Sequence, residues 1–228
     1  LLTDVQGHQL ASRLCGDSAC EPSGRSASAI EASLAELDQV HSKVGAQLQF
    51  TPDGLAKRAR VNATPAKLRE QWGAVLKATG VARDKAYEQL TANIRTLITH
   101  AGDTSNLILD PDLDSYYLMD VTLLALPQMQ DRLGRIGVAG FDAASSGQPL
   151  SVQQRADFVT HASMLAEADA ARVLASSETS MNEDNNFYGA SATLSPSLRP
   201  ALAAWNSAQA AFADKVKRLA GGESVSGE

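Results

Sequence analysis

Apolar residues recur with helical spacing through nearly the whole chain, and no segment alternates apolar and polar residues over strand length. Between residues 26 and 48, for example, Ile30, Leu34, Leu37 and Val44 fall on one helical face. Much of the apolar content is Ala, which packs helices closely and disfavours sheets. The pattern predicts an all-α fold, an elongated antiparallel helical bundle of about six or seven helices.

Two organisations of this bundle fit the pattern. Either residues 1–220 form a single helical domain, or two four-helix-type modules are stacked end to end. Residues 221–228 are polar and are predicted to form a tail.

Caps and breaks predict where the helices begin and end. A Thr, Asp or Ser followed by Pro is typical of a helix start, and this pairing occurs at Thr64, Asp110 and Ser195. Pro127 lies inside an otherwise helical pattern and is predicted to kink it, because its ring removes a backbone donor. The predicted helices cover 1–14, 26–48, 64–80, 82–109, 110–138, 151–181 and 195–219, with a short basic helix at 55–61.

The charge and hydropathy of the chain bound its partners. A formal net charge of −6 argues against nucleic-acid binding, because no basic stripe is available to neutralise phosphates. No run reaches the roughly 20 apolar residues of a membrane span, and no signal peptide is recognisable. The helical pattern starts abruptly without Met, so we expect a domain cut from a longer, membrane-anchored protein.

Cys15 and Cys20 lie in one short loop between two helical patterns. A small disulfide-closed loop is typical of an oxidising compartment such as the periplasm, whereas two free thiols would fit a reducing one. Two thiolates alone do not complete a tetrahedral zinc site, so no metal is predicted here. Motifs for nucleophilic, phosphate or zinc chemistry are absent, the four histidines are scattered, and no cofactor is expected.

The segment 106–120 reads NLILDPDLDSYYLMD and is the most unusual in the chain; we call it the acidic corner. The spacing of Asp110, Asp112 and Asp114 matches the opening of a calcium loop. The match then fails, because Ser115 stands where a sharp turn needs Gly and Val121 where a bidentate Glu is needed.

The acidic corner admits two other interpretations. Helix capping explains the first three aspartates, with Asp110 as the cap and the other two in the first turn. A ligand site would instead use Asp120 with Tyr116 and Tyr117, because a carboxylate beside the apolar stripe needs a cation or a donor. Arg95 and His100 are the candidate partners within the protein, and a ligand amine would also serve.

A second candidate site lies on the first predicted helix. Gln6 and Arg13 are two turns apart and share one face, with His8 nearby and Arg25 and Asp38 further along the chain. Between bundle helices, such a patch would suit a small anion such as nitrate or a carboxylate. The alternative is that these side chains face solvent.

The segment 104–133, TSNLILDPDLDSYYLMDVTLLALPQMQDRL, resembles a stretch of extracytoplasmic sensor regions in bacterial membrane receptors. These receptors are sensor histidine kinases and methyl-accepting chemotaxis receptors. The segment 5–17, VQGHQLASRLCGD, is more distantly similar to the first helix of nitrate- and nitrite-sensing helical domains. Their pattern is closer to Gln-x-His-Arg-Gly, and here Gln9 and Leu10 replace the Arg and the Gly.

The resemblance implies an all-helical periplasmic sensor between two membrane spans of a larger receptor. It would bind a small molecule, such as an anion or an amino or organic acid, or a periplasmic binding protein, and would work as a homodimer. The fragment itself would not be an enzyme, although the parent could be a histidine kinase. The alternative is a structural or interaction module of helices without a small-molecule ligand.

Overall fold

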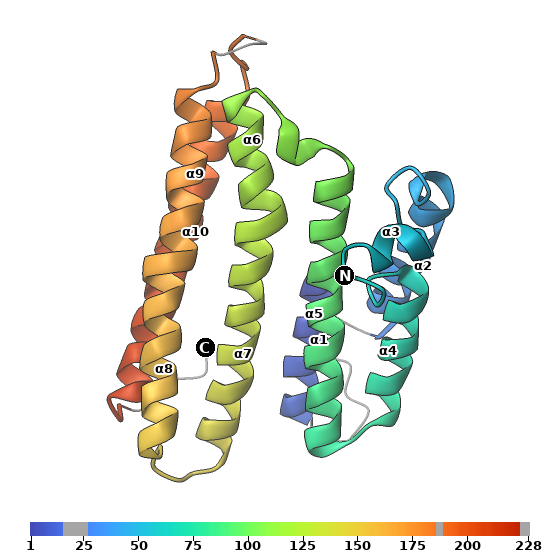
Figure 1. The fold of residues 1–228 in the computed structure, drawn as a ribbon. Coiled ribbons are helices and arrows are strands. Elements are labelled where there is room, and N and C mark those ends of the chain that lie inside the picture. The colour runs from blue at the N-terminus through green and yellow to red at the C-terminus, as the bar shows by residue number, and fades with distance from the viewer. Residues whose placement is uncertain (16–26, 186–188, 224–228) are drawn as a thin grey trace. The chain divides into compact units, whose positions relative to one another are not determined.

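The computed structural model describes residues 1–15, 27–185 and 189–223 (Figure 1). Every regular element among these residues is a helix, so the predicted all-α bundle is confirmed. The chain divides into two compact units, Leu1–Leu107 and Ile108–Glu228. The division falls inside the acidic corner. The proposed disulfide of Cys15 with Cys20 lies outside the described residues and stays a prediction.

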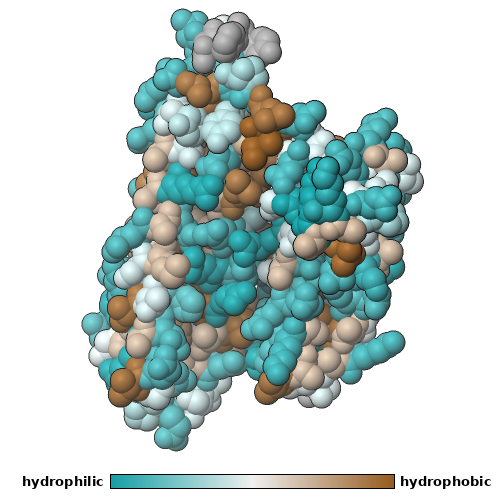
Figure 2. Space-filling view, in the orientation of Figure 1, coloured by the Kyte–Doolittle hydropathy of each residue, from teal (hydrophilic) through white to brown (hydrophobic). Residues whose placement is uncertain are grey.

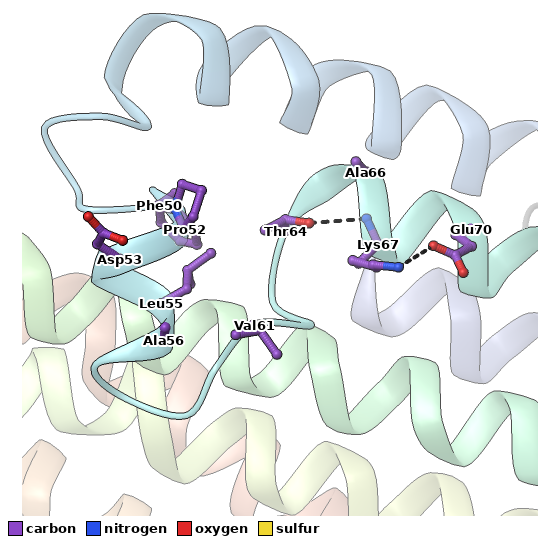
Figure 3. Close-up of a pocket in the computed structure, with 10 residues that line it drawn as sticks. All are labelled: Phe50, Pro52, Asp53, Leu55, Ala56, Val61, Thr64, Ala66, Lys67 and Glu70. Atoms are coloured by element: carbon purple, nitrogen blue, oxygen red, sulfur yellow. Dashed lines mark hydrogen bonds and ion pairs between the residues drawn. The ribbon is translucent and has the colours of Figure 1, made fainter.

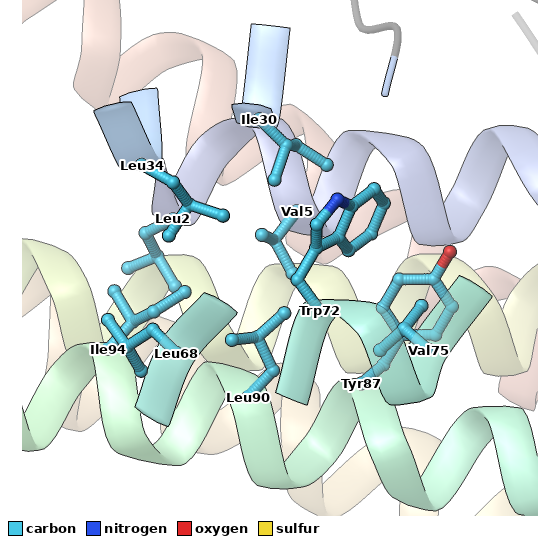
Figure 4. Packing of buried hydrophobic residues seen from close by; sticks show 10 residues of the cluster. All are labelled: Leu2, Val5, Ile30, Leu34, Leu68, Trp72, Val75, Tyr87, Leu90 and Ile94. Atoms are coloured by element: carbon cyan, nitrogen blue, oxygen red, sulfur yellow. The ribbon is translucent and has the colours of Figure 1, made fainter. Parts of the chain in front are cut away.

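The first unit packs its helices around one apolar core. Its elements are α1 (Leu2–Cys15), α2 (Ala27–Val44), α3 (Pro52–Ala56), α4 (Pro65–Lys77) and α5 (Gly80–Thr104), and the 3₁₀ turn η1 (Leu107–Leu109) spans the division between the units. Figure 4 shows Trp72 of α4 beside Val5 of α1 and Ile30 of α2, with Tyr87 and Leu90 of α5 close to it. Each fully buried large apolar side chain contributes about 1.5–3 kcal/mol, so this core holds the unit together.

The second unit consists of two long helices and a third that packs on them. The first long helix is α6 (Leu113–Asp120), η2 (Val121–Ala125) and α7 (Leu126–Ser145), and the second is α8 (Val152–Met164), η3 (Leu165–Ala170) and α9 (Ala171–Asn182). Both η2 and η3 are π-helical segments inside otherwise α-helical rods. The third helix, α10 (Leu194–Ala220), closes a core that includes Met129, Phe158, Leu165 and Val216.

The cap predicted at Thr64 is confirmed, because its Oγ1 accepts the backbone N–H of Lys67 at 3.1 Å and Pro65 follows. We expect Thr64→Ala to lower the free energy of unfolding by about 1 kcal/mol, since one orphan donor of α4 loses its acceptor. Urea denaturation measures this loss. Ser42→Ala is the matched control on the exposed face of α2, and an equal loss in both variants would contradict the cap.

The predicted helix start at Asp110-Pro111 is wrong. The helix α6 begins at Leu113 with Asp112 at the N-cap position, so Pro111 lies outside it. The physical reason is a competing turn: Asp110 Oδ1 accepts the N–H of Asp112 at 3.0 Å, and its Oδ2 accepts the hydroxyl of Ser115 at 2.8 Å.

Other predicted ends also move. The first long helix continues to Ser145 instead of ending near 138, because Ile136 and Ala143 are buried in the core. The predicted short helix at 55–61 is replaced by α3, which starts earlier because Thr51 Oγ1 accepts the N–H of Gly54 at 3.2 Å. The helices predicted to end at 48 and 109 stop at Val44 and Thr104.

The turn between α2 and α3 brings backbone segments into close approach. Gln49 has a positive φ of 51°, which few residues other than glycine adopt. A Cβ atom on Gly54 would lie 2.3 Å from the carbonyl oxygen of Gln49. The turn therefore closes only because Gly54 has no side chain.

Pro127 coincides with a change in helix geometry, as its position in the sequence indicates. The N–H of Leu126 bonds to the carbonyl of Val121, five residues back, and the π-helical segment ends two residues before the proline. Widening the turn in this way accommodates a residue that cannot donate. Within the described ranges, no helix is both long and apolar enough to cross a membrane.

Candidate functional site

Asp120, the last residue of α6, is held by side chains from α9. Arg172 donates to both of its carboxylate oxygens, with Nε at 3.1 Å from Oδ2, and the hydroxyl of Ser176 donates to Oδ2 at 3.1 Å. The prediction that Asp120 needs a cation is confirmed. The donors to Asp120 within the second unit are Arg172 and Ser176, whereas the predicted partner His100 donates to backbone carbonyls of the first unit. The prediction for Arg95, also on α5 of the first unit, stays a prediction.

A second polar contact lies further along the same pair of helices. Asp169 is only 3% exposed, and its carboxylate accepts from Gln128 Nε2 at 3.0 Å and from Arg132 Nε. The other end of the Arg132 guanidinium lies 3.3 Å from the sulfur of Met164. A buried carboxylate needs such donors, because an unpaired charge in a helical core is strongly unfavourable.

The two ion pairs bracket both π-helical segments. Asp120 directly precedes η2 and binds Arg172, which follows η3; Gln128 and Arg132 follow η2 and bind Asp169, which lies in η3. Apolar packing of Val121 and Ala125 of η2 against Val173 of α9 fills the space between them. We call this arrangement the π-segment site. The carboxylate of Asp120 raises the pKa of Arg172 above its ordinary value, so the pair stays charged.

The π-segment site combines fixed charge with irregular helix. π-Helical turns occur often at functional sites, because an inserted residue redirects side chains and leaves the helix able to rearrange. The guanidinium of Arg172 is accessible, since its side chain is 44% exposed, whereas that of Asp120 is 15% exposed. The site can therefore offer a charged fork to an anion from solvent.

The remaining acidic corner is structural in its contacts. Asp114 Oδ1 accepts the N–H of the adjacent Ser115, and the rings of Tyr116 and Tyr117 pack edge to face with centroids 5.4 Å apart. Asp112 is 2% exposed at the N-cap position. Together with the turn made by Asp110, these contacts fix the start of α6 beside the π-segment site. Among the described residues, no group of His, Cys, Asp and Glu is arranged for a metal ion.

The candidate anion patch on α1 is divided among other contacts. Arg13 Nη2 lies 2.6 Å from Asp84, while His8 Nδ1 lies 2.6 Å from the hydroxyl of Tyr87, and Gln6 is 9% exposed. Burial, followed by the charge of Arg83, lowers the pKa of His8, so its ring is neutral at pH 7. The positive charge that would bind an anion is thus reduced, because Arg13 pairs with Asp84 and His8 is uncharged.

The candidate patch also includes Asp38 and Arg25. Asp38 pairs with Arg69 at 2.6 Å, and Arg25 lies outside the described residues, so its part in the patch stays a prediction.

A groove of about 560 Å³ lies in the first unit between α3 and the start of α4 (Figure 3). Figure 3 shows Leu55 and Val61 beside the groove. Lys67 and Glu70, both on α4, form an ion pair at 2.7 Å along its other side. Phe50 also lines the groove, and its ring packs on the ring of His100 with centroids 4.4 Å apart.

Apolar side chains at the start of the acidic corner also reach the surface. Leu107, Ile108 and Leu109 are 47%, 43% and 73% exposed. The face in Figure 2 is mostly hydrophilic and carries only small hydrophobic areas.

Most of the partners at the π-segment site escape prediction from sequence. Arg172 and Asp120 are 52 residues apart, and spacing alone does not indicate which helix meets which. The available signal is a charged residue at an inward position, such as Asp169 four residues after the buried Leu165. Comparisons with protein-family models, with curated proteins and with solved structures give no match for this chain.

Proposed function

We propose that this chain is the periplasmic ligand-sensing domain of a bacterial transmembrane receptor, either a sensor histidine kinase or a chemotaxis receptor. Two observations support the proposal. The segment 104–133 resembles such sensors, and the same segment contains η2, one of the two π-helical segments linked by ion pairs. The second observation carries the proposal, because it gives the bundle an element that can change in response to a ligand.

The proposed response is a small shift of one long helix against the other. An α-helix rises about 1.5 Å per residue, so converting a π-helical turn to α geometry moves the following helix by about that distance. Helix shifts of about 1–2 Å are typical of signalling transitions at packed interfaces. A rearrangement of η2 or η3 is therefore large enough to pass a signal along α7 or α8.

The ion pairs would hold the resting state. Asp120 with Arg172 and Asp169 with Arg132 each join one long helix to the other, on either side of the irregular segments. A ligand shifts such an equilibrium only if it binds one arrangement more tightly than the other. A ligand that competes for one member of an ion pair would bind the arrangement without that pair more tightly.

The exposed Arg172 favours an anionic ligand. A carboxylate or an inorganic oxyanion matches the planar guanidinium fork and would compete with Asp120 for it. An amino acid could also place its amine on the Asp120 carboxylate that is released. The proposed ligands are thus small anions, amino acids or organic acids. A periplasmic binding protein on the side of the bundle is the other proposed partner, and a homodimer the proposed assembly.

Thermal unfolding in the presence of amino acids, organic acids and oxyanions tests the ligand role. A ligand at 100 times its Kd stabilises the folded state by about 2.7 kcal/mol, which raises the Tm of a chain of this size by at least about 5 °C. We expect at least one of these classes to give this rise, and Arg172→Gln to reduce it, because this variant removes the guanidinium that would bind the anion.

The control is Asp157→Ala, which removes an exposed carboxylate of α8 that bonds only Gln153 in the same helix. This variant should keep the full rise in Tm. A rise that survives Arg172→Gln would place the ligand away from the π-segment site. The surrounding reading frame tests the receptor itself: spans on both sides and a following signalling helix are expected, and a frame without spans would overturn the proposal.

A structural or interaction module is the second candidate function. It is favoured by the acidic corner, where Asp110, Asp114 and Asp120 all bond to groups of the same unit. On this proposal, the ion pairs serve only to set the alignment of the long helices. Absence of a Tm rise with every ligand class, in a reading frame without spans, would favour it.

A further inference from the structure

His100 of α5 is fully buried in the first unit and lies against the turn between α2 and α3. Its Nε2 is 3.1 Å from the carbonyl oxygen of Leu48 and 3.2 Å from that of Gln49. Carbonyl oxygens only accept, so Nε2 carries the hydrogen and donates to both. The imidazole therefore joins two consecutive residues of the turn to the C-terminal part of α5.

The other ring nitrogen of His100 has no acceptor for the N–H that protonation would create. Nδ1 is buried and has no hydrogen-bond partner in the structure. Phe50 covers the ring, and the ring of His41 from α2 lies against the same Phe50 at 6.0 Å. Protonation would bury an N–H without an acceptor next to an aromatic ring, which costs far more than protonation in water.

The charges around His100 also oppose protonation. Arg58 and Arg60, in the turn after α3, both lower its pKa, although less than burial does. The nearby carboxylate of Asp103 on α5 forms an ion pair with Arg60 at 2.7 Å. The two carbonyls that accept from Nε2 raise the pKa without reversing the effect. Burial thus holds the pKa of His100 below the ordinary value of about 6.5.

We propose that His100 is a pH-sensitive latch, which holds the turn 45–50 closed when its ring is neutral and releases it on mild acidification. The device is independent of the proposed sensor function. It also reaches the groove of the first unit, because Phe50 lines that groove and packs on His100. Releasing the turn removes one wall of the groove, so protons and a groove ligand would act on the same segment.

The direction of the pH effect follows from linkage. Because the folded pKa lies below the unfolded value, the opened turn takes up a proton as pH falls through about 6.5 while the closed turn does not. Above that pH the closed turn has its maximum stability relative to the open turn. As pH falls further, this stability decreases until the pH reaches the pKa of His100 in the closed turn. At pH 5.5, the ratio of open to closed forms rises by up to about 10-fold.

Amide hydrogen exchange of the full chain at pH 7.5 and 5.5 tests the latch, after correction for the intrinsic pH dependence of exchange. The amides of Leu48 and Phe50 bond within the turn and should lose up to about 10-fold protection at the lower pH. Amides in α4 should not change. His100→Gln keeps a donor near the position of Nε2 and cannot titrate, so protection in this variant should not depend on pH.

The control variant is His41→Gln, which removes the neighbouring histidine and should retain the loss of protection at pH 5.5. Equal protection of the wild-type turn at both pH values would overturn the proposal. So would a loss that persists in His100→Gln. Should that variant fail to fold, an NMR titration of the wild-type His100 ring decides, and a pKa of 6.5 or higher would contradict the latch.

Discussion

Replacing Arg132 with Met is expected to lower the free energy of unfolding by about 3–5 kcal/mol at pH 7, because it leaves a buried carboxylate without its cation. The reason lies in its partner. The Asp169 side chain is 2% exposed, and Arg132 supplies its only cationic donor among the contacts found. Methionine preserves the packing of the aliphatic part of the side chain, so the measured loss of stability reports the removed charge and not a change in volume.

Urea denaturation followed by circular dichroism measures this loss. The double variant Arg132→Met, Asp169→Leu removes both charges and should regain most of the stability, because two apolar residues of similar volume often replace a buried pair without cost. The exposed pair of Arg218 with Glu223 gives the matched control, since Arg218→Met should leave the unfolding midpoint unchanged. A loss below about 1 kcal/mol for Arg132→Met would mean that water or Gln128 satisfies Asp169 alone.

Leu68→Ala is expected to destabilise the first unit by about 2–5 kcal/mol. Leu68 of α4 is fully buried and belongs to the core around Trp72, so truncation leaves a cavity that neighbouring helices fill only in part. Leu76→Ala on the same helix is the matched control, because its side chain is 51% exposed and its loss should stay within about 0.5 kcal/mol.

Tryptophan fluorescence gives this measurement a specific signal. The chain contains two tryptophans, of which Trp72 lies in the core of the first unit and Trp205 packs in the second. In a Trp205→Phe background, the emission of Trp72 follows the first unit directly. Equal midpoints for Leu68→Ala and Leu76→Ala would contradict the assignment of this core.

Periodicity predicts the helices well because burial of an apolar face determines where they form. The helix at 151–181, with Ser151 as its cap, and the helix at 195–219 agree with α8–α9 and α10 within a few residues. Helix ends are less predictable. The helix predicted to end near 138 continues to Ser145, because Ala143 is buried in the core.

The candidate site was only partly predictable. Asp120 stands out because a carboxylate beside an apolar stripe requires a donor, and that requirement can be read from local sequence. Its partner cannot, because the choice of Arg172 over Arg95 depends on which helices are neighbours in space. The π-helical segments leave no clear signal either, except for Pro127 two residues after η2.

The close approach of Gly54 to Gln49 limits which sequences can carry this fold. Any side chain at position 54 would meet a backbone oxygen at 2.3 Å, an obstacle that no choice of rotamer removes. At the facing position the restriction is reversed, because the positive φ of Gln49 would suit glycine better than the residue present. Only glycine fits at position 54 of this turn. Position 49 accepts substitution, and a change to glycine there would relieve backbone strain.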